Sequence, residues 1–198
     1  MEIGKYNIQI DLKADRRSKS MPAIHVTEAQ SALPYVRKYL RGFGVDVGCG
    51  KLKCVPTALG IDFEAGYNRP DLLPKDRDAE VICGWETIFP LMRGESLDYI
   101  FSSGLLEDYE DSTTVLNVWC RTLKPGGYLV LYLPIEAIYR VISGAKYNQA
   151  HNANWESSQD FMDKLDPDFR DGFDVIELSD LIPESRYMFY VVLQKKVA

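Results

Sequence analysis

The chain has 198 residues, of which 46% are hydrophobic, and this length and composition suit one globular domain with a sizeable core. Its formal net charge of −6 argues against a nucleic-acid-binding protein, which normally has a basic face. No apolar run approaches the ~18 residues of a membrane span, and no signal peptide follows Met1. We therefore expect a cytoplasmic protein whose partner is a small molecule, not a nucleic acid or a membrane.

The first part of the chain is predicted to be an appendage. Residues 1–26 form an N-terminal arm, in which alternating apolar residues over 8–12 are typical of a short strand. The main domain is expected over 27–198. Nothing in the sequence indicates a linker or an internal repeat within it.

A helix is predicted to begin the main domain. Thr27 and Gln30 have the spacing of a capping box, and apolar positions continue until Gly42 ends the helix. Pro34 lies inside this segment, which predicts either that the helix starts late or that it is kinked there.

Strands and helices are then expected to alternate. Helices are predicted from Asp111 or Ser112 to Leu123 and from Ser157 to Leu165. Short apolar runs bounded by turn residues predict strands at 43–47, 58–63, 80–83, 97–102, 128–133, 173–178 and 186–194. Alternation of this kind predicts an α/β fold with an open, mostly parallel, Rossmann-like sheet. The last two strands are joined by a short loop only, so they must pair as an antiparallel hairpin.

Two connecting segments also carry predictions. Lys124-Pro125-Gly126-Gly127 is expected to end the preceding helix and to turn directly into the next strand. Residues 134–156 are expected to be an irregular insertion, rich in Tyr and Asn, at the substrate side of the sheet.

A glycine-rich turn follows the first strand of the domain. Gly48-Cys49-Gly50 lets the backbone pass close to a ligand that a β-carbon would displace. A dinucleotide fingerprint needs a third glycine where this chain has Lys53, and the carboxylate of Asp46 would repel a pyrophosphate. The turn therefore favours a ligand that has a cationic or hydroxyl group.

Asp62, at the end of the second strand of the domain, gives the second indication. A carboxylate at this position can accept hydrogen bonds from both hydroxyls of a ribose. The expected ligand has a ribose and an ammonium group but no pyrophosphate, and S-adenosylmethionine fits that description.

The chain resembles the class I S-adenosylmethionine-dependent methyltransferases, of the small, type-11-like kind with a seven-stranded sheet. The resemblance rests on "VDVGCG", "GIDFE", "SLDYIFSSGLLEDYED" and "RTLKPGGYLVLYLP", in the family's order, and covers about residues 27–196. It implies that Gly48, Cys49 and Gly50 surround the methionine part of the cofactor and that Asp46 reaches its amino group. It further implies that Asp62 holds the ribose, Phe63 lies beside the adenine, and Ser102 and Ser103 line the methionine side.

The chain departs from the family at three places. The segment between Gly50 and Asp62 is short and contains a proline, so the first crossover helix is expected to be abbreviated. Gly84-Trp85 stands where relatives have Gly-Asp, so Glu86 or a backbone carbonyl must accept the adenine amine, with Trp85 packing on the ring. Leu106-Glu107-Asp108 stands where relatives have Leu-Glu-His.

The candidate catalytic residues are His151, Glu107 and Asp108. His151 lies in "YNQAHNANW", and it is either an exposed loop histidine or a substrate contact or general base, since an imidazole titrates near neutral pH. If His151 has no such role, the transfer depends on alignment alone or on Glu107 or Asp108. The Tyr and Asn residues around His151 favour a polar acceptor.

The predicted function is methyl transfer from S-adenosylmethionine to O or N of a small polar or sugar-like acceptor. The alternative is a non-catalytic, methyltransferase-like module that binds the cofactor or a partner, and a nicotinamide oxidoreductase ranks third. The four cysteines form no Cys-x-x-Cys pair, so no metal site is expected and the thiols are interpreted as reduced and mostly buried. The sequence does not determine the acceptor or the oligomeric state.

Overall fold

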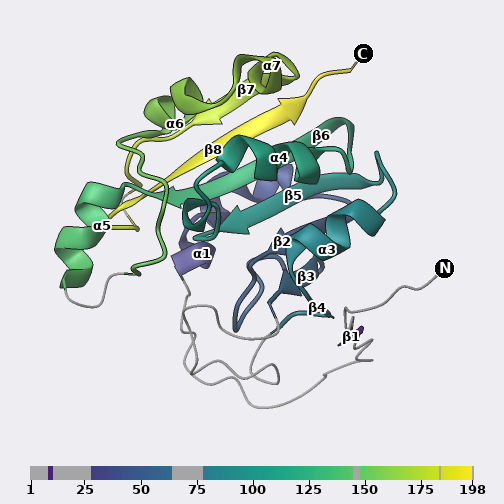
Figure 1. The fold of residues 1–198 in the computed structure, drawn as a ribbon, viewed down its shortest axis with the longest axis horizontal. Helices are drawn as coiled ribbons and strands as arrows, with labels where there is room; N and C mark the ends of the chain where they lie inside the picture. The colour runs from purple at the N-terminus through teal and green to yellow at the C-terminus, as the bar shows by residue number, and fades with distance from the viewer. Residues whose placement is uncertain (1–8, 11–27, 64–77, 145–147, 183, 198) are drawn as a thin grey trace.

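The structure is a computed structural model that describes residues 9–10, 28–63, 78–144, 148–182 and 184–197. An eight-stranded sheet runs through the molecule in the order β1-β4-β3-β2-β5-β6-β8-β7 (Figure 1). The strands are β1 (Gln9–Ile10), β2 (Gly44–Val47), β3 (Leu59–Asp62), β4 (Val81–Ile82), β5 (Leu97–Ser103), β6 (Leu123–Pro134), β7 (Phe173–Leu178) and β8 (Met188–Lys195). The α-helices are α1 (Glu28–Ser31), α2 (Leu33–Val36), α3 (Trp85–Ile88), α4 (Ser112–Cys120), α5 (Glu136–Ser143), α6 (Ser158–Lys164) and α7 (Pro167–Asp171).

The strand pairing confirms the predicted sheet. Strands β4, β3, β2, β5 and β6 are parallel to one another, whereas β8 pairs antiparallel with both β6 and β7. The expected seven strands are all present, and β1 of the N-terminal arm adds an antiparallel edge beside β4. The rest of the predicted arm lies outside the described residues. Because strand order reverses between β2 and β5, a ligand site is expected beyond the carboxyl ends of these two strands.

Each face of the sheet has its own hydrophobic cluster. On the side of α3, α4, α6 and α7, Leu129 and Leu131 of β6 pack with Trp119 of α4. On the opposite side, Val130 of β6 packs with Val36 of α2. Alternate residues of one strand therefore enter opposite layers, as the pleat requires.

The first predicted helix is divided in the structure. It consists of α1, α2 and a 3-10 turn, η1 (Arg37–Tyr39). Pro34 occupies the first turn of α2, where its missing N–H costs no helical hydrogen bond. The proline therefore has the expected effect, whereas Thr27 of the predicted capping box lies outside the described residues.

The interpretation of residues 124–127 was wrong. Helix α4 ends at Cys120, and residues 124–127 lie inside β6, where the pairing with β5 shifts between Leu97 and Tyr99. A β-carbon on Gly127 would lie 2.9 Å from the carbonyl oxygen of Lys124, so this irregular part of the strand needs glycine.

The segment 134–156 is not irregular throughout, as the sequence analysis expected, because α5 occupies its first half. Helix α7 was not predicted either. The crossover from β2 to β3 has no helix over residues 48–58, which confirms that it is abbreviated. Within the described part of the chain, no helix is long and apolar enough to cross a membrane.

Candidate active site

The turn after β2 creates a space bordered by glycine. The N–H of Gly48 donates to the carbonyl of Ile61 at 2.8 Å, and the backbone has φ +74° at Gly48 and φ +58° at Gly50. A β-carbon on Gly48 would lie 2.9 Å from Leu105, whereas one on Gly50 would meet no atom of the described residues within 4 Å. Gly50 therefore borders open space that a ligand could fill, which is the property expected of a cofactor cradle.

Cys49, between the two glycines, points into the protein. Its side chain is buried, and its sulfur lies beside Gly60 of β3, 3.0 Å from where a β-carbon would be if that glycine had one. Burial raises the pKa of the thiols of Cys49, Cys54 and Cys120, so they remain protonated and unreactive. All four cysteines are free, and Cys83 is only half-buried.

Asp62 connects the ends of β2 and β3. One carboxylate oxygen accepts the N–H of Gly50 at 2.8 Å, and the other accepts the N–H of Phe63 at 2.7 Å. The residue predicted to hold a ribose thus also fixes the shape of the glycine turn.

Asp46 makes a hydrogen bond within the abbreviated crossover between β2 and β3. Its side chain is only 2% exposed, and it accepts the N–H of Cys54 at 2.6 Å. Burial raises the pKa of this carboxyl to about 7, although the backbone hydrogen bonds and nearby Lys53 oppose the shift. The ammonium group of Lys53 is itself buried, paired with Glu80 and bonded to the carbonyl of Ala58 at 3.0 Å. Lys53, where a dinucleotide fingerprint would have glycine, therefore supports the loop.

Ser102 and Ser103 end β5 beside this turn. The buried hydroxyl of Ser102 donates to the carbonyl of Val47 at 3.0 Å, which ties β5 to β2. Ser103, the last residue of β5, is half-buried.

Phe63, Gly84 and Glu86 lie together on the other side of the turn. A β-carbon on Gly84 would come within 2.9 Å of the Phe63 ring and would overlap the Glu86 carboxylate, so this corner also needs glycine. Trp85 points elsewhere: its ring meets Tyr109 and Trp119 edge-on, at centroid distances of 5.5 and 6.2 Å. Trp85 is thus a packing residue of the core in this structure.

His151 is buried in a cluster of charged side chains. Only 6% of its side chain is exposed, and Nδ1 lies 2.7 Å from a carboxylate oxygen of Glu136. Nε2 lies 3.7 Å from Glu107 Oε1 and 4.0 Å from Asp108 Oδ1. Tyr139 stacks on the ring at 4.8 Å. The structure therefore brings the three predicted catalytic residues together, and His151 is not an exposed loop histidine.

Backbone contacts hold this cluster against the 3-10 turn η4 (Leu106–Asp108). The carbonyl of Glu107 accepts the N–H groups of Asn152 and Ala153 at 2.8 and 2.9 Å. Asn148 donates to the Asp108 carboxylate at 3.2 Å. Burial raises the pKa of Asp108, and the charge of His151 and the Asn148 hydrogen bond oppose this shift.

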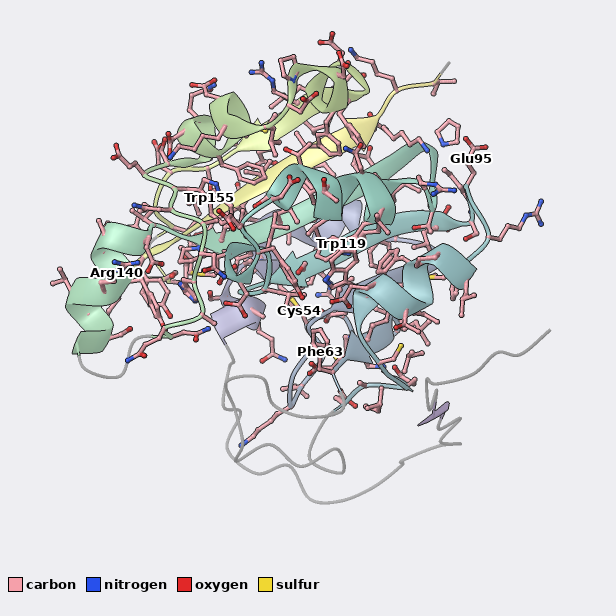
Figure 2. The ribbon with its side chains drawn as sticks, in the orientation of Figure 1. Cys54, Phe63, Glu95, Trp119, Arg140 and Trp155 are labelled. Carbon is pink, nitrogen blue, oxygen red and sulfur yellow. The ribbon has the colours of Figure 1, made fainter. Side chains whose placement is uncertain are left out.

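The cluster lies at the same edge of the sheet as the glycine turn. Gly104 follows β5, and a β-carbon there would be 3.6 Å from Glu107 Oε1. Its neighbour Leu105 is the residue that a side chain at Gly48 would strike. Figure 2 shows Arg140 on α5, beyond the carboxyl end of β5. The glycine turn and the His151 cluster therefore lie at the same edge of the sheet, which is the edge where sheets of this kind bind ligands.

Glu136 is the site residue that sequence reasoning missed. It was overlooked because α5 was not predicted. The available signal was the spacing of Glu136, Tyr139 and Arg140 at i, i+3 and i+4, which puts the three side chains on one face of a helix.

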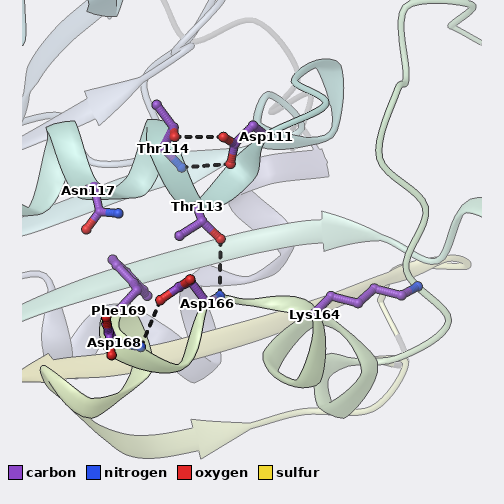
Figure 3. A pocket seen from close by; sticks show the side chains of 8 residues that line it. All are labelled: Asp111, Thr113, Thr114, Asn117, Lys164, Asp166, Asp168 and Phe169. Carbon is purple, nitrogen blue, oxygen red and sulfur yellow. Dashed lines mark hydrogen bonds between the residues drawn. The ribbon is translucent and has the colours of Figure 1, made fainter.

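A second, polar hollow lies between the start of α4 and helices α6 and α7 (Figure 3). Two of its three acidic groups are helix caps: Asp111 accepts the N–H of Thr114 at 3.0 Å, and Asp166 accepts that of Asp168 at 2.8 Å. None of the candidate site residues lines it. Among the described residues, no group of three or more His, Cys, Asp or Glu is placed to hold a metal ion.

Comparison with known proteins agrees with this geometry. A family model described as a methyltransferase domain matches residues 45–131. Residues 45–131 therefore resemble a methyltransferase domain, and the fold of the chain is that of class I methyltransferases. The cofactor of such domains is S-adenosylmethionine, and the space beside Gly50 and the carboxylate of Asp62 fit that group. No curated protein matches the chain.

Solved methyltransferase structures share the fold of this chain. A possible histamine N-methyltransferase from Thermotoga maritima has 20% identity and a TM-score of 0.58, covering 85% of this chain and 89% of that one. A SAM-dependent methyltransferase from Archaeoglobus fulgidus has 12% identity and a TM-score of 0.59, covering 84% and 92%. The N-methyltransferase NodS from Bradyrhizobium japonicum has 15% identity and a TM-score of 0.55, covering 86% and 96%.

Proposed function

We propose that the protein transfers a methyl group from S-adenosylmethionine to O or N of a small polar or sugar-like acceptor. The observation that carries the proposal is the buried His151, which Glu136 holds at the same sheet edge as the glycine turn. A buried imidazole with an oriented ring is the arrangement of a general base.

The cofactor half of the site is assigned to the residues around the turn. Gly48, Cys49 and Gly50 would surround the methionine part with their backbone, and Asp62 would accept the ribose hydroxyls. The adenine would lie beside Phe63. These roles are supported by the open space at Gly50 and by the direct contact of Asp62 with the turn.

The remaining cofactor contacts are assigned to residues near Gly84 and at the ends of β2 and β5. Glu86 or a backbone carbonyl next to Gly84 would accept the adenine amine. Ser103 would line the methionine side. Asp46 and Ser102 would support that side indirectly, because the hydrogen bond of Asp46 holds the loop after β2 and that of Ser102 joins β5 to β2.

When bound, the cofactor supplies a methyl group already activated by its sulfonium. The protein has to hold the acceptor in line, and alignment of this kind reaches effective molarities of ~10⁵ M and above. His151 would remove a proton from the acceptor through Nε2. Glu107 and Asp108, on the same side, would stabilise the imidazolium that forms.

The acceptor is assigned by the polar groups around His151. Asn148 donates to the hydroxyl of Tyr139 and to the carboxylate of Asp108, so the surroundings of the imidazole are polar and suit a polar molecule. One of the similar structures is named as a possible N-methyltransferase and another as an N-methyltransferase, so amines are tested beside hydroxyl compounds as candidate acceptors.

The rival function is a non-catalytic module that binds the cofactor or a partner. The observations that favour it are the internal hydrogen bond of Asp46 and the core packing of Trp85. Both residues lie at positions where the resemblance implies contact with the cofactor.

Calorimetry and an acceptor screen test the proposal. We expect S-adenosylmethionine and S-adenosylhomocysteine to bind and NAD not to bind. Amines and hydroxyl compounds are then screened for release of S-adenosylhomocysteine. Binding without turnover on any acceptor would favour the non-catalytic module, and binding of NAD alone would overturn the methyltransferase assignment.

A further inference from the structure

We propose that Glu136 is a positioning residue that fixes the tautomer and the direction of the His151 ring, so that Nε2 is the nitrogen that accepts a proton. The inference rests on the proposed function and adds to it a residue that no sequence motif indicates. Glu136 is only 1% exposed, and one of its carboxylate oxygens lies 2.7 Å from His151 Nδ1.

Helix α5 holds the imidazole from two directions. Glu136 contacts the Nδ1 edge of the ring, and Tyr139, one turn later, stacks on its face with an interplanar angle of 22°. Arg140 completes the arrangement, because its Nε donates to the other carboxylate oxygen of Glu136 at 2.6 Å. The three side chains lie on one face of α5, so the helix places them as a unit.

This arrangement selects one tautomer. An ionised carboxylate can only accept hydrogen bonds, so the ring nitrogen that faces Glu136 must carry the proton. The neutral ring then has its lone pair on Nε2. The carboxylates of Glu107 and Asp108 face Nε2 from 3.7 and 4.0 Å, beyond hydrogen-bonding distance. Nε2 is therefore the basic atom of the cluster.

The charges around the ring favour the protonation of Nε2. Glu107 and Asp108 of η4 and Glu136 of α5 face the imidazole, and Arg140 lies behind Glu136. When Nε2 takes a proton, the positive charge forms beside carboxylates, which stabilise it.

The variant Glu136→Gln tests the role of the carboxylate. Arg140 Nε–H retains the carbonyl oxygen of the new amide, so the amide NH₂ group faces Nδ1 and donates to it. The proton of the neutral ring then moves to Nε2. We expect turnover to fall by about 10²–10⁴-fold, the usual contribution of a general base, with the affinity for S-adenosylhomocysteine unchanged.

The tautomer can be measured without cofactor or acceptor. The sequence has two histidines, His25 and His151, so the ¹⁵N spectrum of the imidazoles is assigned with a His25→Gln variant. At a pH where the ring is neutral, we expect the proton of His151 on Nδ1 in the parent and on Nε2 in Glu136→Gln.

A second substitution separates positioning from general damage. In Glu136→Gln with Arg140→Met, the hydrogen bond from Arg140 to the amide oxygen is removed, so the amide can turn and accept from Nδ1–H. We expect the double variant to regain the Nδ1–H tautomer and part of the turnover that the single variant loses. Glu110→Gln removes the same charge from an exposed side chain near η4 and should leave both the tautomer and turnover as in the parent.

The outcomes separate this inference from the proposed function. If Glu136→Gln keeps the Nδ1–H tautomer, or shows parent-like turnover, Glu136 does not position His151. If Arg140→Met restores neither property, the arrangement of the three side chains is wrong. If the parent shows the expected tautomer and responds to both substitutions but methylates no acceptor, the proposed function fails while the positioning by Glu136 stands.

Discussion

Gly48 and Gly50 both have positive φ, but only one of them borders open space. An alanine at Gly50 would add backbone strain of about 1–2 kcal/mol, and its methyl group would enter the space assigned to the methionine part of the cofactor. We expect Gly50→Ala to fold, with a lower free energy of unfolding, and to lose most of its affinity for S-adenosylhomocysteine. Calorimetry and urea unfolding measure the two effects separately.

Gly144 offers a matched control for that variant. It also has positive φ, at +53°, and a β-carbon there would also meet no described atom within 4 Å, but it ends α5 away from the glycine turn. Gly144→Ala should lower stability at least as much as Gly50→Ala and should bind S-adenosylhomocysteine like the parent. Equal affinity in the two variants would mean that the cofactor lies elsewhere.

At the scale of the element, α4 depends on its cap. Asp111 accepts hydrogen bonds from the N–H of Thr114 at 3.0 Å and from its hydroxyl at 2.7 Å. We expect Asp111→Ala to lower the free energy of unfolding by about 1 kcal/mol, the typical value of an N-cap, as measured in urea. Cofactor affinity should not change, because the polar hollow that Asp111 lines in Figure 3 has no part in the proposed site.

The comparison for α4 is an exposed neighbour that caps nothing. Glu110→Ala removes a carboxylate one residue earlier in the chain, and its effect on unfolding should be smaller than that of Asp111→Ala. A loss of cofactor affinity in Asp111→Ala alone would give the hollow a functional role and would contradict our interpretation of Asp111 as a helix cap.

At the scale of the whole molecule, Asp46 makes stability depend on pH. Burial raises its pKa to about 7 in the folded protein, from an ordinary value of 3.8. Between these two values the unfolded chain releases the proton and the folded protein keeps it. The free energy of unfolding should therefore fall as pH rises through this window, by up to about 1.4 kcal/mol per unit, and the contribution should level off above it.

The variant Asp46→Asn tests this dependence. Its amide oxygen can still accept the N–H of Cys54, but the side chain no longer titrates. Urea unfolding between pH 4.5 and 8 should show that the variant lacks the decline seen in the parent. A variant with the parent's pH dependence would show that another group causes the decline, and Glu110→Gln controls for the loss of one carboxylate.

Most of the sheet could be predicted from the sequence. β7 spans Phe173–Leu178 as predicted, and the glycine turn lies directly after β2. Such features depend on neighbours in the chain, namely the alternation of apolar residues and the residues that a tight turn requires. The error at residues 124–127 had the same basis, because a proline-glycine run signals a turn equally well when it forms a bulge.

The sequence analysis missed helix α5 and the contacts that it makes with His151. Ile138, Val141 and Ile142 have the i, i+3, i+4 spacing of an amphipathic helix, but Val141 and Ile142 are 82% and 44% exposed, so this apolar face does not pack on the core. Its buried contact is polar and depends on a histidine 15 residues further along the chain.

Residue types and short spacings in the sequence were enough to predict the fold class, the glycine turn and three candidate catalytic residues. The burial of His151, and the contact of Glu107 and Asp108 with one ring nitrogen and of Glu136 with the other, follow from the three-dimensional structure alone. The physical reason is that η4 meets residues 152–153 through backbone hydrogen bonds, which no local pattern encodes. Burial and ring orientation arise from that long-range contact.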